Sequence, residues 1–120
     1  MSEFDTTKIY GLLDDFSGRA SQIDRILSKD DKLEEQEIDT LNRLYGKRKE
    51  IIENLDKILN SEEGSIFLKE NMEDWQSKIN PVLELDKRNL DKLNSRVKEL
   101  GGALKQLNKQ KSVLIYTKEK

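Results

Sequence analysis

The sequence contains no cysteine and no histidine, and it has a single proline among its 120 residues. Without imidazole or thiolate groups, the chain lacks the commonest general base, the commonest transition-metal ligands and any disulfide. No stretch approaches the roughly 20 consecutive apolar residues that a membrane-spanning helix requires. The opening MSEFD also lacks the basic and apolar regions of a signal peptide. We therefore expect a cytoplasmic protein that is not an enzyme, holds no cofactor or metal and does not insert into a membrane.

Charge is abundant but balanced. Charged residues make up 38% of the chain, hydrophobic residues 34%, and the formal net charge is −2. Because both signs are interspersed, there is no basic stripe of the kind that binds phosphate backbones, and nucleic acid is not an expected partner. The length suits one domain covering residues 1–120, with a narrow core and wide solvated faces.

Apolar residues recur with gaps of three and four, the spacing of one buried helix face. The first stripe is Ile9, Leu13, Phe16, Ala20, Ile23 and Leu27. The second stripe is Ile38, Leu41, Tyr45, Ile52, Leu55 and Ile58 or Leu59. The third stripe is Leu90, Leu93, Val97, Leu100, Leu104 and Leu107. Three amphipathic helices in a short chain predict an all-α, antiparallel helical bundle of three long helices with a short extra helix.

Polar segments set the expected boundaries. The first helix is predicted at about 5–28, and the second runs from 34 or 37 to about 59, followed by a loop over 60–65. We expect a short segment over 65–79 to fold across the end of the bundle and a long last helix to run from 81 to about 116. Pro81 either kinks one helix or stands at the first position of a new helix capped by Asn80.

Asp86 falls on the apolar seam of the last helix, where a leucine would be expected. A buried carboxylate needs a partner, so Asp86 either lies in water at a bundle end or pairs with a basic residue such as Arg48. The core prediction is that Leu93, Val97 and Leu100 pack against Leu41, Tyr45 and Ile52.

The C-terminal region carries the candidate binding residues. Gly101-Gly102 is a weak point in a helix and provides either a close backbone approach or a hinge. Beyond it, an apolar patch at 113–116 stands in a charged tail, and it either folds back on the bundle or is presented to another protein. The predicted partner-binding residues are Leu104, Leu107, Val113, Leu114, Ile115 and Tyr116.

The second predicted helix carries a family resemblance. It has an acidic start at Glu37, two leucines three apart at Leu41 and Leu44, Arg48 four residues on, then an apolar pair and Leu55. This order resembles the second helix of small flagellar type III export chaperones of the FlgN and FliT kind. The residues LDKRN at 85–89 resemble the start of their last long helix, and Tyr116 resembles a C-terminal tyrosine that engages the export apparatus there.

The resemblance implies a small helical chaperone that binds the helical end of a flagellar structural subunit, prevents premature assembly and delivers it to the export gate. Its partners would be a client helix, seated by helix-in-groove packing, and a component of the export apparatus. The alternative is a self-associating coiled-coil structural or adaptor protein whose last seam closes a homodimer. A monomer favours the chaperone, and a tight dimer favours the structural protein.

Overall fold

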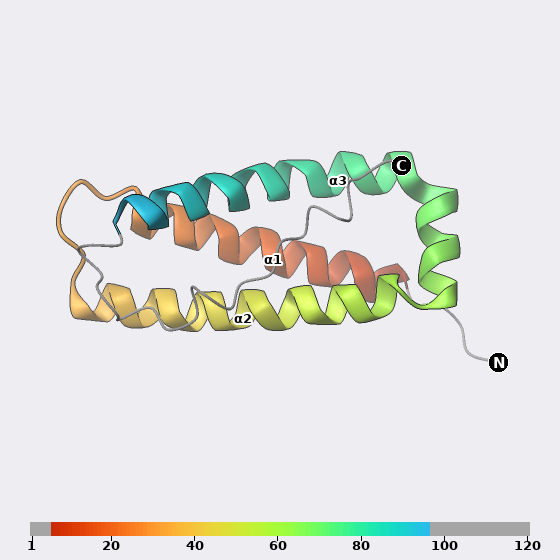
Figure 1. Ribbon diagram of the computed structural model, residues 1–120, viewed down its shortest axis with the longest axis horizontal. Helices are drawn as coiled ribbons and strands as arrows, with labels where there is room; N and C mark the ends of the chain where they lie inside the picture. Colours follow the sequence, from red (N-terminus) through yellow and green to blue (C-terminus); the bar gives the residue numbers. More distant parts are fainter. Residues whose placement is uncertain (1–5, 97–120) are drawn as a thin grey trace.

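The computed structural model describes residues 6–96, and within that range it contains three helices and no strand (Figure 1). These helices are α1 (Thr6–Leu27), α2 (Glu35–Leu59) and α3 (Glu62–Ser95). They lie side by side, with α2 antiparallel to α1 and most of α3 antiparallel to α2. The all-α prediction is confirmed for this part of the chain.

The apolar stripes face one another in the core. All six residues of the first stripe are buried, and so are Leu41, Tyr45, Ile52, Leu55 and Leu59 of the second. Two buried clusters divide the length of the bundle. One contains Phe16, Leu55 and Trp75. The other contains Leu41, Tyr45 and Leu93, so Leu93 joins the second helix as predicted, whereas Ile52 belongs to the first cluster.

α3 changes direction near its start. Asn71 departs from helical geometry (φ −123°, ψ 23°), and its side-chain Nδ2 donates to the carbonyl of Phe67 at 2.9 Å. Residues 62–70 cross the end of the bundle, and the rest of α3 returns along the other helices (Figure 1). At 1.5 Å per residue, residues 72–95 span about 36 Å, which matches the roughly 38 Å of α2. The bend therefore fits the longest helix to its shorter neighbour.

Of the two predictions for Pro81, a new helix capped by Asn80 is wrong, and a kink is not confirmed. Pro81 lies inside α3, and the one non-helical residue of that helix is Asn71. A proline removes the hydrogen bond to the carbonyl four residues earlier, here that of Ser77. Pro81 and Ser77 are both exposed, so water can satisfy that carbonyl. The helix therefore continues, and the boundaries predicted at 65–79 and from 81 are replaced by one bend at Asn71.

The connection between α2 and α3 is shorter than the predicted loop over 60–65. Ser61 caps α3, because its Oγ accepts from the Gly64 N–H at 3.0 Å. A Cβ added to Gly64 would lie 2.0 Å from the carbonyl oxygen of Ile58 and 2.7 Å from Cα of Leu59. The absence of a side chain at Gly64 thus lets the two helices approach backbone to backbone.

α3 ends at Ser95, with Arg96 as its C-cap, and does not run unbroken to about 116 as predicted. Val97, Leu100 and the pair Gly101-Gly102 lie outside the described residues. Their predicted packing and hinge roles stay predictions.

Candidate functional site

The predicted partner-binding residues follow the last described residue. Leu104, Leu107, Val113, Leu114, Ile115 and Tyr116 lie outside the described residues. What the structure does define is the point from which they begin. That point is Arg96, at the end of the bundle where α1 stops and α2 starts.

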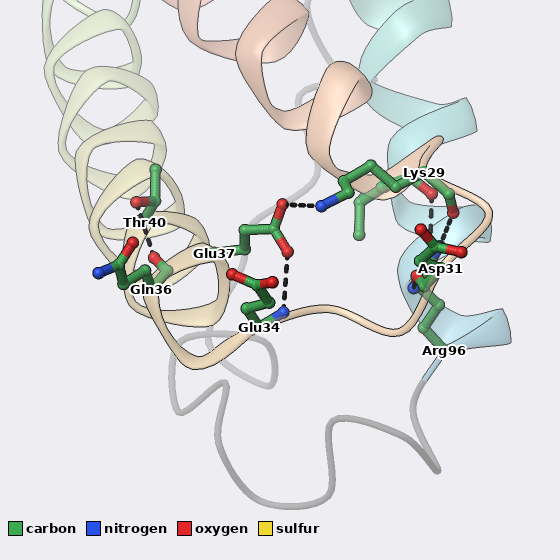
Figure 2. Close-up of polar contacts among 8 residues, drawn as sticks. Lys29, Asp31, Glu34, Gln36, Glu37, Thr40 and Arg96 are labelled. Carbon is green, nitrogen blue, oxygen red and sulfur yellow. Dashed lines mark hydrogen bonds and ion pairs between the residues drawn. The ribbon is translucent and has the colours of Figure 1, made fainter.

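Arg96 anchors the end of α3 to the loop between α1 and α2 (Figure 2). Its guanidinium donates to the backbone carbonyl of Leu27 at 3.2 Å, to that of Asp31 at 3.3 Å and also to that of Lys29. A guanidinium carries several donors in a fixed plane, which suits it to gather carbonyls that face one another across a loop. Arg96, the last described residue, is therefore held in a fixed position against this loop.

The same loop is tied to the start of α2. Figure 2 shows Glu37 between two donors: the backbone N–H of Glu34, at 2.8 Å, and the Lys29 ammonium. The Glu34 N–H, followed by the Lys29 ammonium, lowers the pKa of the Glu37 carboxyl, and this carboxyl in turn raises the pKa of Lys29. Glu37 stands at the third position of α2, where a carboxylate satisfies an amide of the first turn.

A second polar contact joins α1 to α3 at this end. The Lys92 ammonium lies 2.5 Å from Oδ1 of Asp24 and 2.8 Å from Oγ of Ser28. The hydrogen bond from Lys92 is the largest cause that lowers the pKa of the Asp24 carboxyl. Arg96 and Lys92 together fix the last turn of α3 against α1.

A buried ion pair crosses the middle of the bundle between α2 and α3. Arg48 Nε donates to Asp86 Oδ1 and Arg48 Nη2 donates to Asp86 Oδ2, both at 2.7 Å. The Arg48 guanidinium also lies 6.0 Å from the ring centroid of Phe16 and 5.9 Å from that of Tyr45. Of the two alternatives for Asp86, the pair with Arg48 is confirmed.

Other polar atoms surround this pair. Asn89 Nδ2 donates to the backbone carbonyl of Ala20 at 2.9 Å, which brings α1 into the same layer. The hydroxyl of Tyr45 and Oδ1 of Asn89 are buried without a hydrogen-bond partner. Burial, followed by the negative charge of Asp86, raises the pKa of Tyr45. This polar layer is better suited to fix the alignment of α2 and α3 than to catalyse a reaction, because a bidentate pair forms in only one alignment of the two helices.

The opposite end of the bundle carries an apolar surface. Ile66 is 50% exposed and is the large hydrophobic residue of the described range that lies in solvent. Beside it is a pocket of about 260 Å³ lined by Thr6, Glu63, Ile66, Phe67, Glu70 and Asn71. Its floor is firm, because Phe67 packs on Tyr10 and Trp75 with ring centroids 6.0 and 6.1 Å away.

Tyr10 also links this end to the returning part of α3. Its hydroxyl donates to Asp74 Oδ2 at 2.9 Å, and the Lys78 ammonium lies 5.8 Å from its ring centroid. Burial, followed by the bond to Asp74, raises the pKa of Tyr10, and the same bond lowers the pKa of the Asp74 carboxyl.

Arg96, Ile66 and the Tyr10–Phe67–Trp75 cluster were not among the predicted site residues. A basic residue at the end of a helix is a known signal for carbonyl binding, so Arg96 could have been found. The exposure of Ile66 could not, because it depends on the bend at Asn71. That bend turns Phe67 inward and leaves its neighbour outside.

Among residues 6–96, no group of three or more histidine, cysteine, aspartate or glutamate side chains is placed to hold a metal ion. None of the helices in this range combines the length and apolar composition needed to cross a membrane. Comparison of the chain with protein-family models, with curated proteins and with solved structures found no match.

Proposed function

We propose that the protein is a cytoplasmic export chaperone. It would bind a helical segment of a flagellar structural subunit, prevent premature assembly and deliver the subunit to the type III export gate. This role consists of binding, and it needs no catalytic group, cofactor or nucleic acid. Support comes from the resemblance carried by residues 37–55 and from an all-helical described region.

The position of Arg96 is the observation that carries the proposal. Arg96, the last described residue, is held at the level where α1 ends. The sequence keeps the apolar spacing of a buried face at Leu100, Leu104 and Leu107. A stripe with this spacing is suited to packing against a helix of another protein.

The described helices leave little other surface for a client. Their apolar faces pack against one another in two internal clusters, and Ile66 is the exposed large hydrophobic residue within residues 6–96. A client helix needs a continuous apolar stripe rather than one side chain. We therefore assign client binding to Leu104 and Leu107 with the patch at 113–116.

The client assignment is tested with Leu104→Asp combined with Leu107→Asp, and Asn108→Asp is the matched control because it adds charge beside the stripe. Calorimetric titration against hook-filament junction and filament-cap proteins is expected to show a loss of about tenfold or more for the double variant. The control should bind like the wild type. Equal affinity in all three proteins, with unchanged melting curves, would contradict the assignment.

Tyr116 is proposed to contact the export apparatus. An aromatic ring supplies a large contact area at low rotamer cost, and its hydroxyl can bond at a wet rim. Tyr116→Ala should weaken binding to an export component by more than about 1 kcal/mol, roughly fivefold, with an unchanged melting temperature. A variant that loses stability but keeps its affinity would show that Tyr116 belongs to the core of the protein.

Oligomeric state separates this proposal from a self-associating coiled coil. Size-exclusion chromatography with light scattering should report a monomer for the full chain. A tight dimer that Leu104→Asp dissociates would replace the chaperone with a homodimeric structural protein.

A further inference from the structure

The pocket beside Ile66 begins where the described chain begins. Thr6, the first residue of α1, is one of its lining residues, and Ile66 and Phe67 supply its apolar wall. The five residues that precede Thr6 therefore start at the rim of this pocket. Two of them, Met1 and Phe4, are large and apolar.

We propose that the side chain of Phe4 occupies this pocket and covers Ile66. Two residues of extended chain span at most about 7 Å, so Phe4 is within direct reach of a pocket that Thr6 lines. An aromatic side chain can bury roughly 150–250 Å², which suits a wall made of a half-exposed isoleucine and a phenylalanine. Met1, three residues farther out, is less restricted in position.

The start of α1 gives an independent reason. In the sequence, Phe4 and Asp5 directly precede Thr6, and Ile9 is the fourth residue of α1. A short acidic cap between two such apolar residues is the pattern of a hydrophobic staple, in which the residue before the cap packs against the fourth helical residue. Ile9 is fully buried in the cluster that contains Phe67. The staple thus directs Phe4 toward the same end of the bundle as the pocket.

The apolar wall of the pocket is held in place by neighbouring side chains, which favours the binding of one side chain in a defined position. Phe67 is held by Tyr10 and Trp75, and the Asn71 side chain is bonded to the Phe67 carbonyl, so the wall exists before Phe4 arrives. Binding to a preformed apolar wall loses little conformational freedom beyond that of the incoming side chain. Once Phe4 is docked, Ile66 would not be available to a client.

A double-mutant cycle on the full chain tests this docking. The variants are Phe4→Ala, Ile66→Ala and the pair, with Glu3→Ala as the matched control next to Phe4. Each single variant should lower the melting temperature by about 4 °C or more, because both contribute to one apolar contact. The double variant should fall by clearly less than the sum of the two, and Glu3→Ala should melt like the wild type.

Each other result overturns the proposal. Two neutral single variants would mean that Phe4 does not dock. Additive losses would mean that Phe4 packs elsewhere, and a neutral Phe4→Ala with altered client binding or oligomeric state in Ile66→Ala would give the pocket to a partner or a second copy. Nuclear Overhauser contacts between the Phe4 ring and the Ile66 methyl groups provide a second measurement, and their absence would also overturn it. The docking is independent of the export role, so either can fail alone.

Discussion

Arg48 and Asp86 face each other inside the bundle as a doubly hydrogen-bonded pair, with both N···O distances at 2.7 Å. Both side chains are almost fully buried, and they come from neighbouring helices 38 positions apart in sequence. Removing two charges from water costs several kcal/mol per ion, and good geometry offsets this cost only while both partners are present. The pair therefore fixes the alignment of α2 and α3 more surely than it adds stability.

Removing one partner should be far more damaging than replacing both. Asp86→Ala leaves the Arg48 guanidinium buried without its carboxylate, and we expect the free energy of unfolding to fall by about 3–5 kcal/mol. The combined Arg48→Met and Asp86→Leu variant should recover most of this loss, because apolar side chains of similar length fill the space. Urea denaturation at pH 7 measures all three proteins. A double variant as unstable as Asp86→Ala would show that the pair itself stabilises the fold.

Leu93 should be a key core position at the Arg96 end of the bundle. It is fully buried with Leu41 and Tyr45, so Leu93→Ala removes methyl groups from a packed site. We expect a loss of about 2–5 kcal/mol in the free energy of unfolding. Lys87→Ala, an exposed change on the same helix, should stay within about 0.5 kcal/mol. An unchanged melting temperature in Leu93→Ala would mean that this seam is not buried in solution.

Tyr45→Phe should not weaken the protein. The Tyr45 hydroxyl is buried without a hydrogen-bond partner, so its removal at pH 7 should leave stability unchanged or raise it by about 1 kcal/mol. Because burial raises its pKa, the folded state keeps the proton above pH 10.0, the ordinary value, where the unfolded chain loses it. The ionisation of Tyr45 therefore leaves the free energy of unfolding unchanged below pH 10 and lowers it as the pH rises further.

The measurement is urea denaturation between pH 8 and 11. Tyr45→Phe should lose less stability than the wild type above about pH 10, since one tyrosine ionisation no longer favours the unfolded state. Tyr10→Phe is the comparison, because its hydroxyl does have a partner in Asp74. A large loss for Tyr45→Phe at pH 7 would show that its hydroxyl is bonded after all.

Asp24 should contribute to acid sensitivity. The Lys92 ammonium lowers the pKa of its carboxyl below the ordinary 3.8, so the folded state favours the ionised form. This contribution is present above pH 3.8 and is lost as the pH falls through the lowered pKa. Asp24→Asn should therefore flatten the loss of stability below about pH 4, as measured by urea denaturation between pH 2 and 7. Since the contact is solvent-exposed, the difference should shrink in 1 M salt.

The helices with regular apolar spacing could be predicted closely from the sequence. α1 was expected at about 5–28 and spans Thr6–Leu27, because its six apolar residues leave one choice of buried face. Asp86 was also informative, since a carboxylate on an apolar seam demands a counter-charge and Arg48 lies on the facing helix.

The bend in α3 could not be placed in the same way. Proline is the strongest helix breaker by propensity, yet Pro81 stands on an exposed face where its missing hydrogen bond costs little. Asn71 bends the helix because its side-chain amide donates to the Phe67 carbonyl, which the Asn71 backbone N–H would bond in a regular helix. The bent direction is stabilised by the packing of Phe67 on Trp75. Leu33 was missed for a similar reason: it is buried from within a loop, where no helical period marks it.

Gly64 couples the position of residues 62–70 to the aromatic core. Its missing side chain sets the separation between the start of α3 and the last turn of α2, where a methyl group would meet the Ile58 carbonyl oxygen at 2.0 Å. A substitution as small as alanine must push residues 62–70 outward, and Asn71 is the natural pivot. Phe67, on the displaced segment, would then move away from Trp75, so one carbon added at the buried contact between α2 and α3 would also disturb the aromatic core.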